Sequence, residues 1–244
     1  MTFAEQTRAV RLPSPLDRRF YFIISLIIAG VVAAGFSRTI SARLFHPSSA
    51  RPIILYVHAA LFSGWIALFI TQTALIWTRN IKLHRKLGLR AIPLGVAIPI
   101  VGVWTALAMG RLHVQQGDMG DAAAAESLIV SLYDMVAFTI PFAGAVYWRK
   151  KPEFHRRLMM IATCALTSAA IGRLIPVTAS DEWIYVGVDF LILLVVGCDF
   201  IATKRIHPVY LYGLPALLLG QTITLYVDLS RSREWLALAH RLIG

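Results

Sequence analysis

The chain has 244 residues, of which 57% are hydrophobic and 15% charged, and its mean hydropathy is +0.66. A soluble domain has about 25% charged residues, so this composition excludes a soluble globular protein. In a soluble protein, the net charge of +11 would indicate a nucleic-acid partner. Here the basic residues lie between apolar runs, as they do in the cytoplasmic loops of membrane proteins, so no nucleic-acid binding is expected.

Seven apolar runs have the length that a membrane-spanning helix needs. The third run contains Pro93 and Pro99 and the fourth contains Pro141, and membrane helices tolerate proline where neighbouring helices satisfy the freed carbonyl groups. The chain is therefore predicted to be all-α, an integral membrane bundle of about seven transmembrane helices. In chain order the runs cover residues 20–36, 52–77, 88–109, 127–148, 158–177, 183–203 and 208–229.

Three segments follow from these runs. Residues 1–19 are polar and basic and form a predicted cytoplasmic N-terminal segment, and residues 20–230 form the seven-helix transmembrane domain. Residues 231–244 alternate apolar side chains with Arg and His, the pattern of an amphipathic helix that lies at the membrane surface.

The distribution of Lys and Arg predicts the orientation of the bundle. Sixteen of them lie in the N-terminal segment and in the second, fourth and sixth loops, against eight on the other side. Cytoplasmic loops carry the excess of Lys and Arg, so the prediction is a cytoplasmic N-terminus and an external C-terminus. The expected location is the bacterial inner membrane, with the lipid bilayer as the main partner.

Four ionisable residues fall within the outer halves of four different predicted spans: His58, Asp134, Arg173 and Asp189. Charged groups in a span are costly, so they indicate either a functional pocket or a set of paired groups that hold helices together. Arg173 is expected to pair with Asp134 or Asp189, which would offset much of the cost of burial. His58 would then be the titratable or ligating member of an outward-facing pocket.

A second polar cluster is predicted on the cytoplasmic side. His84, His155 and His207 each precede or begin a helix that runs outward, Asp199 ends the sixth run on the same side, and Gln72 lies about one turn inside the second run. Three imidazoles and a carboxylate at one level are ligands suited to zinc or iron, and a pair of imidazoles is suited to heme b. The alternative interpretation is that these are ordinary basic loops in contact with lipid phosphate.

Two resemblances add to this interpretation. The segments around His58, His84 and His155 resemble a group of bacterial multi-pass membrane proteins that carries HR-x-LG and H-R-R-L-M motifs, and that group implies no particular activity. His84 to Gly88 also reads H-x-x-L-G, which is similar to a helix start in transmembrane b-type cytochromes. The motifs of this chain are His84-Arg85-Lys86-Leu87-Gly88 and His155-Arg156-Arg157-Leu158-Met159.

The first functional hypothesis is therefore a membrane protein with a histidine-based metal or heme site that takes part in electron transport. The second is a non-redox membrane protein that binds or conducts a small molecule or a proton through the outward-facing pocket. The third is a structural or assembly subunit that packs in a membrane complex or a homo-oligomer. No nucleophile elbow, phosphate loop or HExxH motif is present, so the sequence identifies no catalytic residue and leaves open whether the protein is an enzyme.

Overall fold

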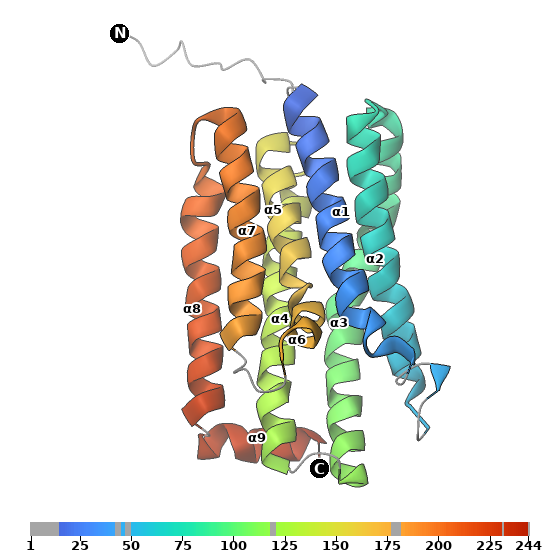
Figure 1. Cartoon of the computed structure of the whole chain (residues 1–244), viewed down its shortest axis with the longest axis vertical. Helices are drawn as coiled ribbons and strands as arrows, with labels where there is room; N and C mark the ends of the chain where they lie inside the picture. Colours follow the sequence, from blue (N-terminus) through green and yellow to red (C-terminus); the bar gives the residue numbers. More distant parts are fainter. Residues whose placement is uncertain are drawn as a thin grey trace.

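A computed structural model describes residues 15–41, 45–46, 50–117, 121–176, 182–230 and 232–243. Most of the predicted N-terminal segment 1–19, together with Arg231 and Gly244 of the predicted tail, lies outside these residues. The described part of the chain is all-helical, with long helices packed side by side (Figure 1). The helices are α1 (Pro15–Ser37), α2 (Ile53–Trp77), α3 (Ile81–Gln116), α4 (Asp121–Tyr147), α5 (Pro152–Ala165), α6 (Ser168–Leu174), α7 (Glu182–Thr203), α8 (Pro208–Ser230) and α9 (Arg233–Ile243).

Local sequence signals account for many of the helix ends. Proline opens α1, α5 and α8, where its missing N–H costs nothing and its fixed φ suits a helix. The side chain of Asn80 caps α3 by accepting from the backbone N–H of Leu83 at 3.3 Å. Gly117 ends α3 with φ at +68°, a left-handed conformation that favours glycine.

Six helices of the described chain are long and apolar enough to cross a membrane: α1, α2, α3, α4, α7 and α8. The predicted fifth run does not form one straight helix. Instead, α5 and α6 are separated by a short break and bent by 42°, and they make a seventh span only if the bent pair is counted as one. Thr167 lies in the break, and its hydroxyl donates to the carbonyl oxygen of Cys164 at 2.6 Å.

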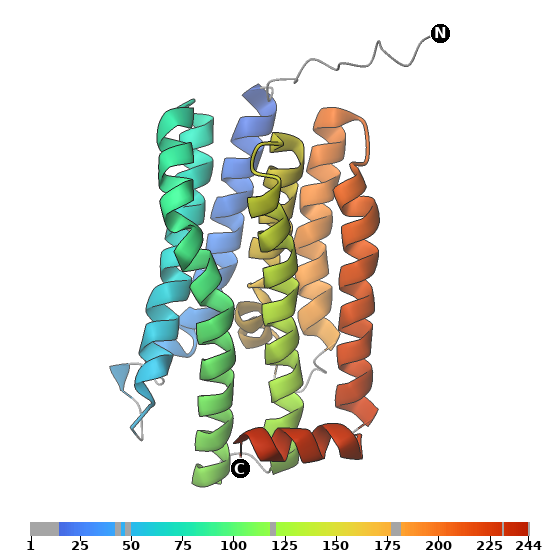
Figure 2. The same ribbon diagram turned by 180° about the vertical axis from the view of Figure 1, so that it is seen from behind.

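The bundle has two distinct ends. At the N-terminal end, where α1 begins, lie the connections α2–α3, α4–α5 and α7–α8 (Figure 1). At the opposite end, α9 runs across the lower ends of α3 and α4 (Figure 2). Arg111 on α3 anchors α9 there, since its Nη2 donates to the carbonyl oxygen of Leu242 at 2.8 Å. The predicted amphipathic tail is therefore a helix docked on the bundle.

Small residues and polar bridges hold the spans together, as expected where lipid removes most of the hydrophobic driving force between helices. Gly95 and Gly102 lie two turns apart on α3, and a Cβ atom at either would collide with Phe142 or Met135 of α4. Hydroxyl groups add bridges: Tyr133 of α4 donates to the carbonyl oxygen of Leu217 in α8 at 2.7 Å.

Reporters of membrane sidedness test this topology. A reporter fused ahead of α1 and one fused after Ile243 are expected to report opposite sides of the membrane, because the bent pair α5–α6 then crosses and makes the number of spans odd. The fusion ahead of α1 is expected on the cytoplasmic side. Both reporters on one side would show that α5–α6 does not cross.

Candidate functional site

A buried ion pair lies at the N-terminal end of the bundle. Nε of Arg157 on α5 donates to Oδ2 of Asp199 on α7 at 2.8 Å, and Nη2 donates to Oδ1 at 2.9 Å. Both side chains are only 2% exposed. Such two-pronged pairs are the strong form of charge-assisted hydrogen bond, and only such pairing makes two buried charges tolerable.

This pair belongs to a larger network. Glu153, one turn before Arg157 on α5, accepts from Nη1 of Arg157 at 2.6 Å and from Nη2 of Arg156 at 2.7 Å. The hydroxyl of Tyr21 on α1 donates to Oδ1 of Asp199 at 3.1 Å. Two guanidinium groups thus face two carboxylates, so the network is charge-balanced and joins α1, α5 and α7.

Beside this network, the rings of His84 on α3 and His155 on α5 face each other. Their centroids are 6.4 Å apart, and the ring planes cross at 76°. Nδ1 of His155 lies 2.8 Å from the carbonyl oxygen of Ala145. A carbonyl oxygen only accepts, so Nδ1 carries the proton and Nε2 of neutral His155 keeps a free lone pair.

Gln72 of α2 holds the other ring. When the amide is oriented so that both of its polar atoms are satisfied, its nitrogen donates to Nδ1 of His84. The same nitrogen lies 3.2 Å from the carbonyl oxygen of His84, and the amide oxygen accepts from the N–H of Gly88 at 3.0 Å. His84 then carries its proton on Nε2, so the two rings have opposite tautomers.

Of the four residues predicted for this cluster, the structure brings His84 and His155 together. His207 packs edge-on against Phe154 at a centroid distance of 4.7 Å, and its Nδ1 accepts from the N–H of Val209 at 3.2 Å. The carboxylate of Asp199 is held by Arg157 and Tyr21. Within the described ranges, no three or more His, Cys, Asp or Glu side chains converge as metal ligands would.

The four residues predicted for an outward-facing pocket have separate partners. Asp134 accepts from the hydroxyl of Ser168, and Asp189 accepts from Nε2 of Gln221 at 2.9 Å. The guanidinium of Arg173 donates to the hydroxyl of Thr39 and lies over the ring of Phe36, and His58 stacks on Phe62. Among the described residues, Arg173 forms no ion pair with either aspartate, so that expectation was wrong.

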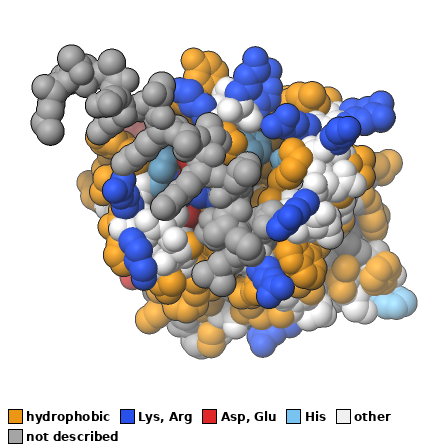
Figure 3. Space-filling view, turned by 90° about the horizontal axis from the view of Figure 1, so that it is seen from above, with side chains coloured by type: hydrophobic (Ala, Val, Ile, Leu, Met, Phe, Trp, Pro, Cys, Tyr) orange, Lys and Arg blue, Asp and Glu red, His pale blue; other side chains and the backbone are white. Residues whose placement is uncertain are grey.

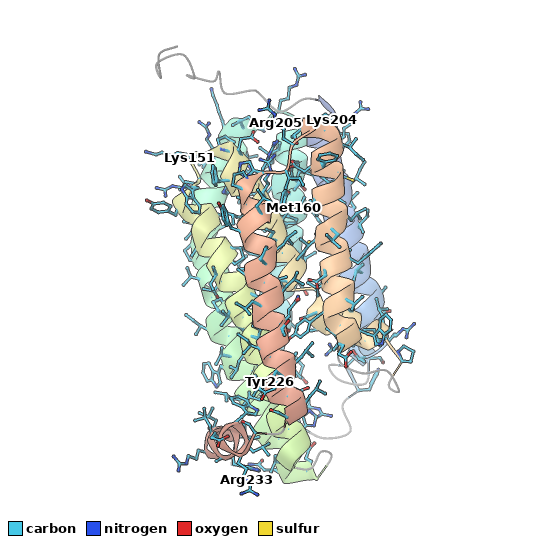
Figure 4. All side chains as sticks on the ribbon, turned by 90° about the vertical axis from the view of Figure 1, so that its left-hand side faces the viewer. Lys151, Met160, Lys204, Arg205, Tyr226 and Arg233 are labelled. Carbon is cyan, nitrogen blue, oxygen red and sulfur yellow. The ribbon has the colours of Figure 1, made fainter. Side chains whose placement is uncertain are left out.

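Basic side chains mark the surface of the N-terminal end. Viewed onto that end, Lys and Arg side chains are spread over the face and its rim, with histidine and acidic side chains visible further in (Figure 3). Lys151, Lys204 and Arg205 project from the α4–α5 and α7–α8 connections (Figure 4). The histidine pair therefore lies beneath the end that the charge count assigns to the cytoplasm.

Sequence reasoning identified Asp199 but not the residues that hold it. Arg156 and Arg157 belong to the basic loops of the charge count, and Glu153 and Tyr21 are not among the predicted site residues. The spacing of Glu153 ahead of both arginines, three and four residues apart, is a helical pairing pattern that was available in the sequence. Tyr210 is 2% exposed, and its ring lies 6.0 Å from the guanidinium carbon of Arg157.

No family model matches the chain, and no curated protein and no solved structure is significantly similar to it.

The ion pair yields a stability prediction. Asp199→Asn removes the buried one of the two carboxylates that hold the guanidinium of Arg157 and leaves only Glu153, which is 44% exposed, so the free energy of unfolding is expected to fall by up to about 3–5 kcal/mol. Thermal unfolding of detergent-purified protein measures the change. The double variant Asp199→Leu with Arg157→Met removes both buried charges and is expected to recover part of the stability that Asp199→Asn loses. Lys151→Ala, which changes an exposed residue at the same end, serves as the control. An unchanged unfolding temperature in Asp199→Asn would contradict the prediction.

His207 yields a pH prediction. Burial, and next the positive charge of Arg157, lower the pKa of His207, while Glu153 and Asp199 raise it and Arg156 lowers it further. The folded protein therefore disfavours protonated His207, so its contribution to stability is present above the ordinary histidine pKa and is lost as pH falls below it. Histidine ¹⁵N spectra, assigned with His207→Gln, are expected to place its midpoint below the ordinary value. A midpoint at or above that value would rule this out.

Proposed function

We propose that the chain is a multi-pass protein of the bacterial inner membrane in which His84 and His155 bind a transition-metal ion or a heme iron and support electron transfer. The observation that carries the proposal is the convergence of the two imidazoles, 6.4 Å between centroids, from separate helices. No other pair of histidine rings in the described chain makes such a contact.

The donor set fits heme better than a structural zinc site. Structural zinc takes four protein ligands, and the described residues offer two at this place. Heme iron in b-type cytochromes is held by histidine imidazoles, and His84 and His155 are the residues that would hold it here. Bound there, a heme iron would supply reversible one-electron oxidation and reduction.

The residues around the rings orient both imidazoles, but only those around His155 already leave its Nε2 free to ligate. The carbonyl oxygen of Ala145 accepts from Nδ1 of His155, which orients the ring, fixes the tautomer and leaves Nε2 free. To ligate through Nε2, His84 has to carry its proton on Nδ1 instead. The amide of Gln72 then has to reverse, so that its oxygen accepts from Nδ1. The balanced ion network beside the pair adds no net charge to the site.

A second candidate function follows from the same contacts. His155 offers a lone pair on Nε2, and His84, held by Gln72, offers an N–H. A donor and an acceptor imidazole at one place form a route for proton transfer, because each ring can take a proton on one nitrogen and release it from the other. This candidate needs no metal and keeps Gln72 in its satisfied orientation.

The purified protein distinguishes the two candidates. Protein expressed in heme-replete cells and isolated in detergent is expected to show a Soret band, with about one heme per chain or, failing heme, one equivalent of metal by elemental analysis. His84→Ala and His155→Ala are each expected to lose the bound group, because each removes one of two ligands. His46→Ala, an exposed histidine far from the pair in sequence, is the matched control.

A colourless and metal-free protein that takes up neither hemin nor iron nor zinc would overturn the metal proposal. Proton exchange by the pair would then be tested by pH-dependent ¹⁵N shifts of His84 and His155. Coupled titration of both rings, abolished when either is replaced by alanine, is the expected result of the second candidate.

A further inference from the structure

The broken fifth span brings hydroxyl groups to the interior of the bundle. At the break between α5 and α6, Thr167 and Ser168 are 0% and 3% exposed. Interrupted membrane helices occur where a backbone lines a binding site, because the interruption frees polar groups that a straight helix uses internally. The break is therefore a candidate position for a buried binding site.

A carboxyl group lies at this break. Asp134 of α4 forms a hydrogen bond with the hydroxyl of Ser168, the first residue of α6. Among the described residues Asp134 has no ion pair. One hydroxyl offsets little of the cost of a charge in a membrane interior, so the carboxyl has a strong reason to hold a proton.

The titratable and charged groups described on the surrounding helices bond to other partners and do not form an ion pair with Asp134. Tyr133, next to Asp134, donates to the carbonyl oxygen of Leu217, and Asp189 on α7 accepts from Gln221. Arg173, on α6, is directed to Thr39 of the segment after α1 and to the carbonyl oxygen of Ala169. His58 of α2 is stacked on Phe62.

The Asp134–Ser168 contact also links the short helix α6 to the unbroken helix α4 at the bend. Ser168 begins the short helix α6, which is bent by 42° from α5, and Asp134 belongs to the unbroken helix α4. Protonated Asp134 can donate to the hydroxyl oxygen, whereas the carboxylate can only accept from it. A protonated carboxyl can also accept from the hydroxyl through its carbonyl oxygen, so loss of the proton limits the bond to the direction from Ser168 to Asp134 and places a negative charge at the break.

We propose that Asp134, with Ser168 as its hydrogen-bond partner at the break between α5 and α6, is a site that binds and releases a proton within the membrane. In the step, the O–H bond of the Asp134 carboxyl breaks, its electron pair stays on the carboxylate, and the proton passes to water. None of the residues of this site belongs to the His84–His155 pair at the N-terminal end.

Infrared difference spectroscopy of the full-length protein in nanodiscs tests the proposal. The expected result is a carbonyl stretch of a protonated aspartic acid that disappears reversibly as pH is raised. Asp134→Asn is expected to remove this band. Asp189→Asn, an aspartate in a span that also has a neutral partner, is the matched control and is expected to leave the band unchanged.

Ser168→Ala is the second variant. It keeps the carboxyl group and removes its hydrogen-bond partner, so the band is expected to persist at a shifted frequency and to titrate at a different pH. Its readout remains available if Asp134→Asn does not fold, which size-exclusion chromatography shows. None of these measurements depends on a bound metal or heme.

Three results would overturn the proposal. A wild-type protein without an Asp134 band at low pH would show a permanently ionised group. A band that persists at all pH values at which the protein stays folded would show a locked structural acid. A band that sodium chloride removes at constant pH, with potassium chloride inactive, would assign the site to a sodium ion instead.

Discussion

The N-terminal end of the bundle depends on the ion pair between Arg157 and Asp199. Separating the buried guanidinium from its carboxylate would cost several kcal/mol. The pair therefore fixes how α5 and α7 are rotated about their axes and how far along each other they are placed. Tyr21 extends the same constraint to α1. His155 lies two residues before Arg157, so the pair also fixes where its imidazole points, which is toward His84 of α3.

The two halves of the bundle treat polar groups differently. At the N-terminal end, charges are paired, and two arginines and two carboxylates cancel within one network. Away from that end, Asp134 and Asp189 each meet a neutral partner, Ser168 and Gln221. Paired charges hold helices in a fixed arrangement, whereas a carboxyl with a neutral partner can bind and release a proton. The first kind of contact stabilises the fold, and the second suits a group that titrates.

The two proposed sites have a physical connection. An electron that enters a buried centre adds negative charge in a medium of low dielectric, and proton uptake elsewhere in the bundle lowers the cost of that charge. The span α5–α6 links the two places, because it carries His155 and Arg157 at one end and Ser168 beyond the break. A change in the angle between α5 and α6 would therefore move residues at both sites.

The sequence by itself determined the all-helical membrane character, because the length and hydrophobicity of each run are properties of a single segment. It also placed His84 and His155 at one level. Only the tertiary structure decided that Arg157, counted as a basic loop residue, is buried against Asp199, that Arg173 reaches neither aspartate, and that the fifth run is broken. These outcomes depend on how helices rotate and approach one another, and distances between side chains on different helices are not encoded in the spacing of residues along any one of them.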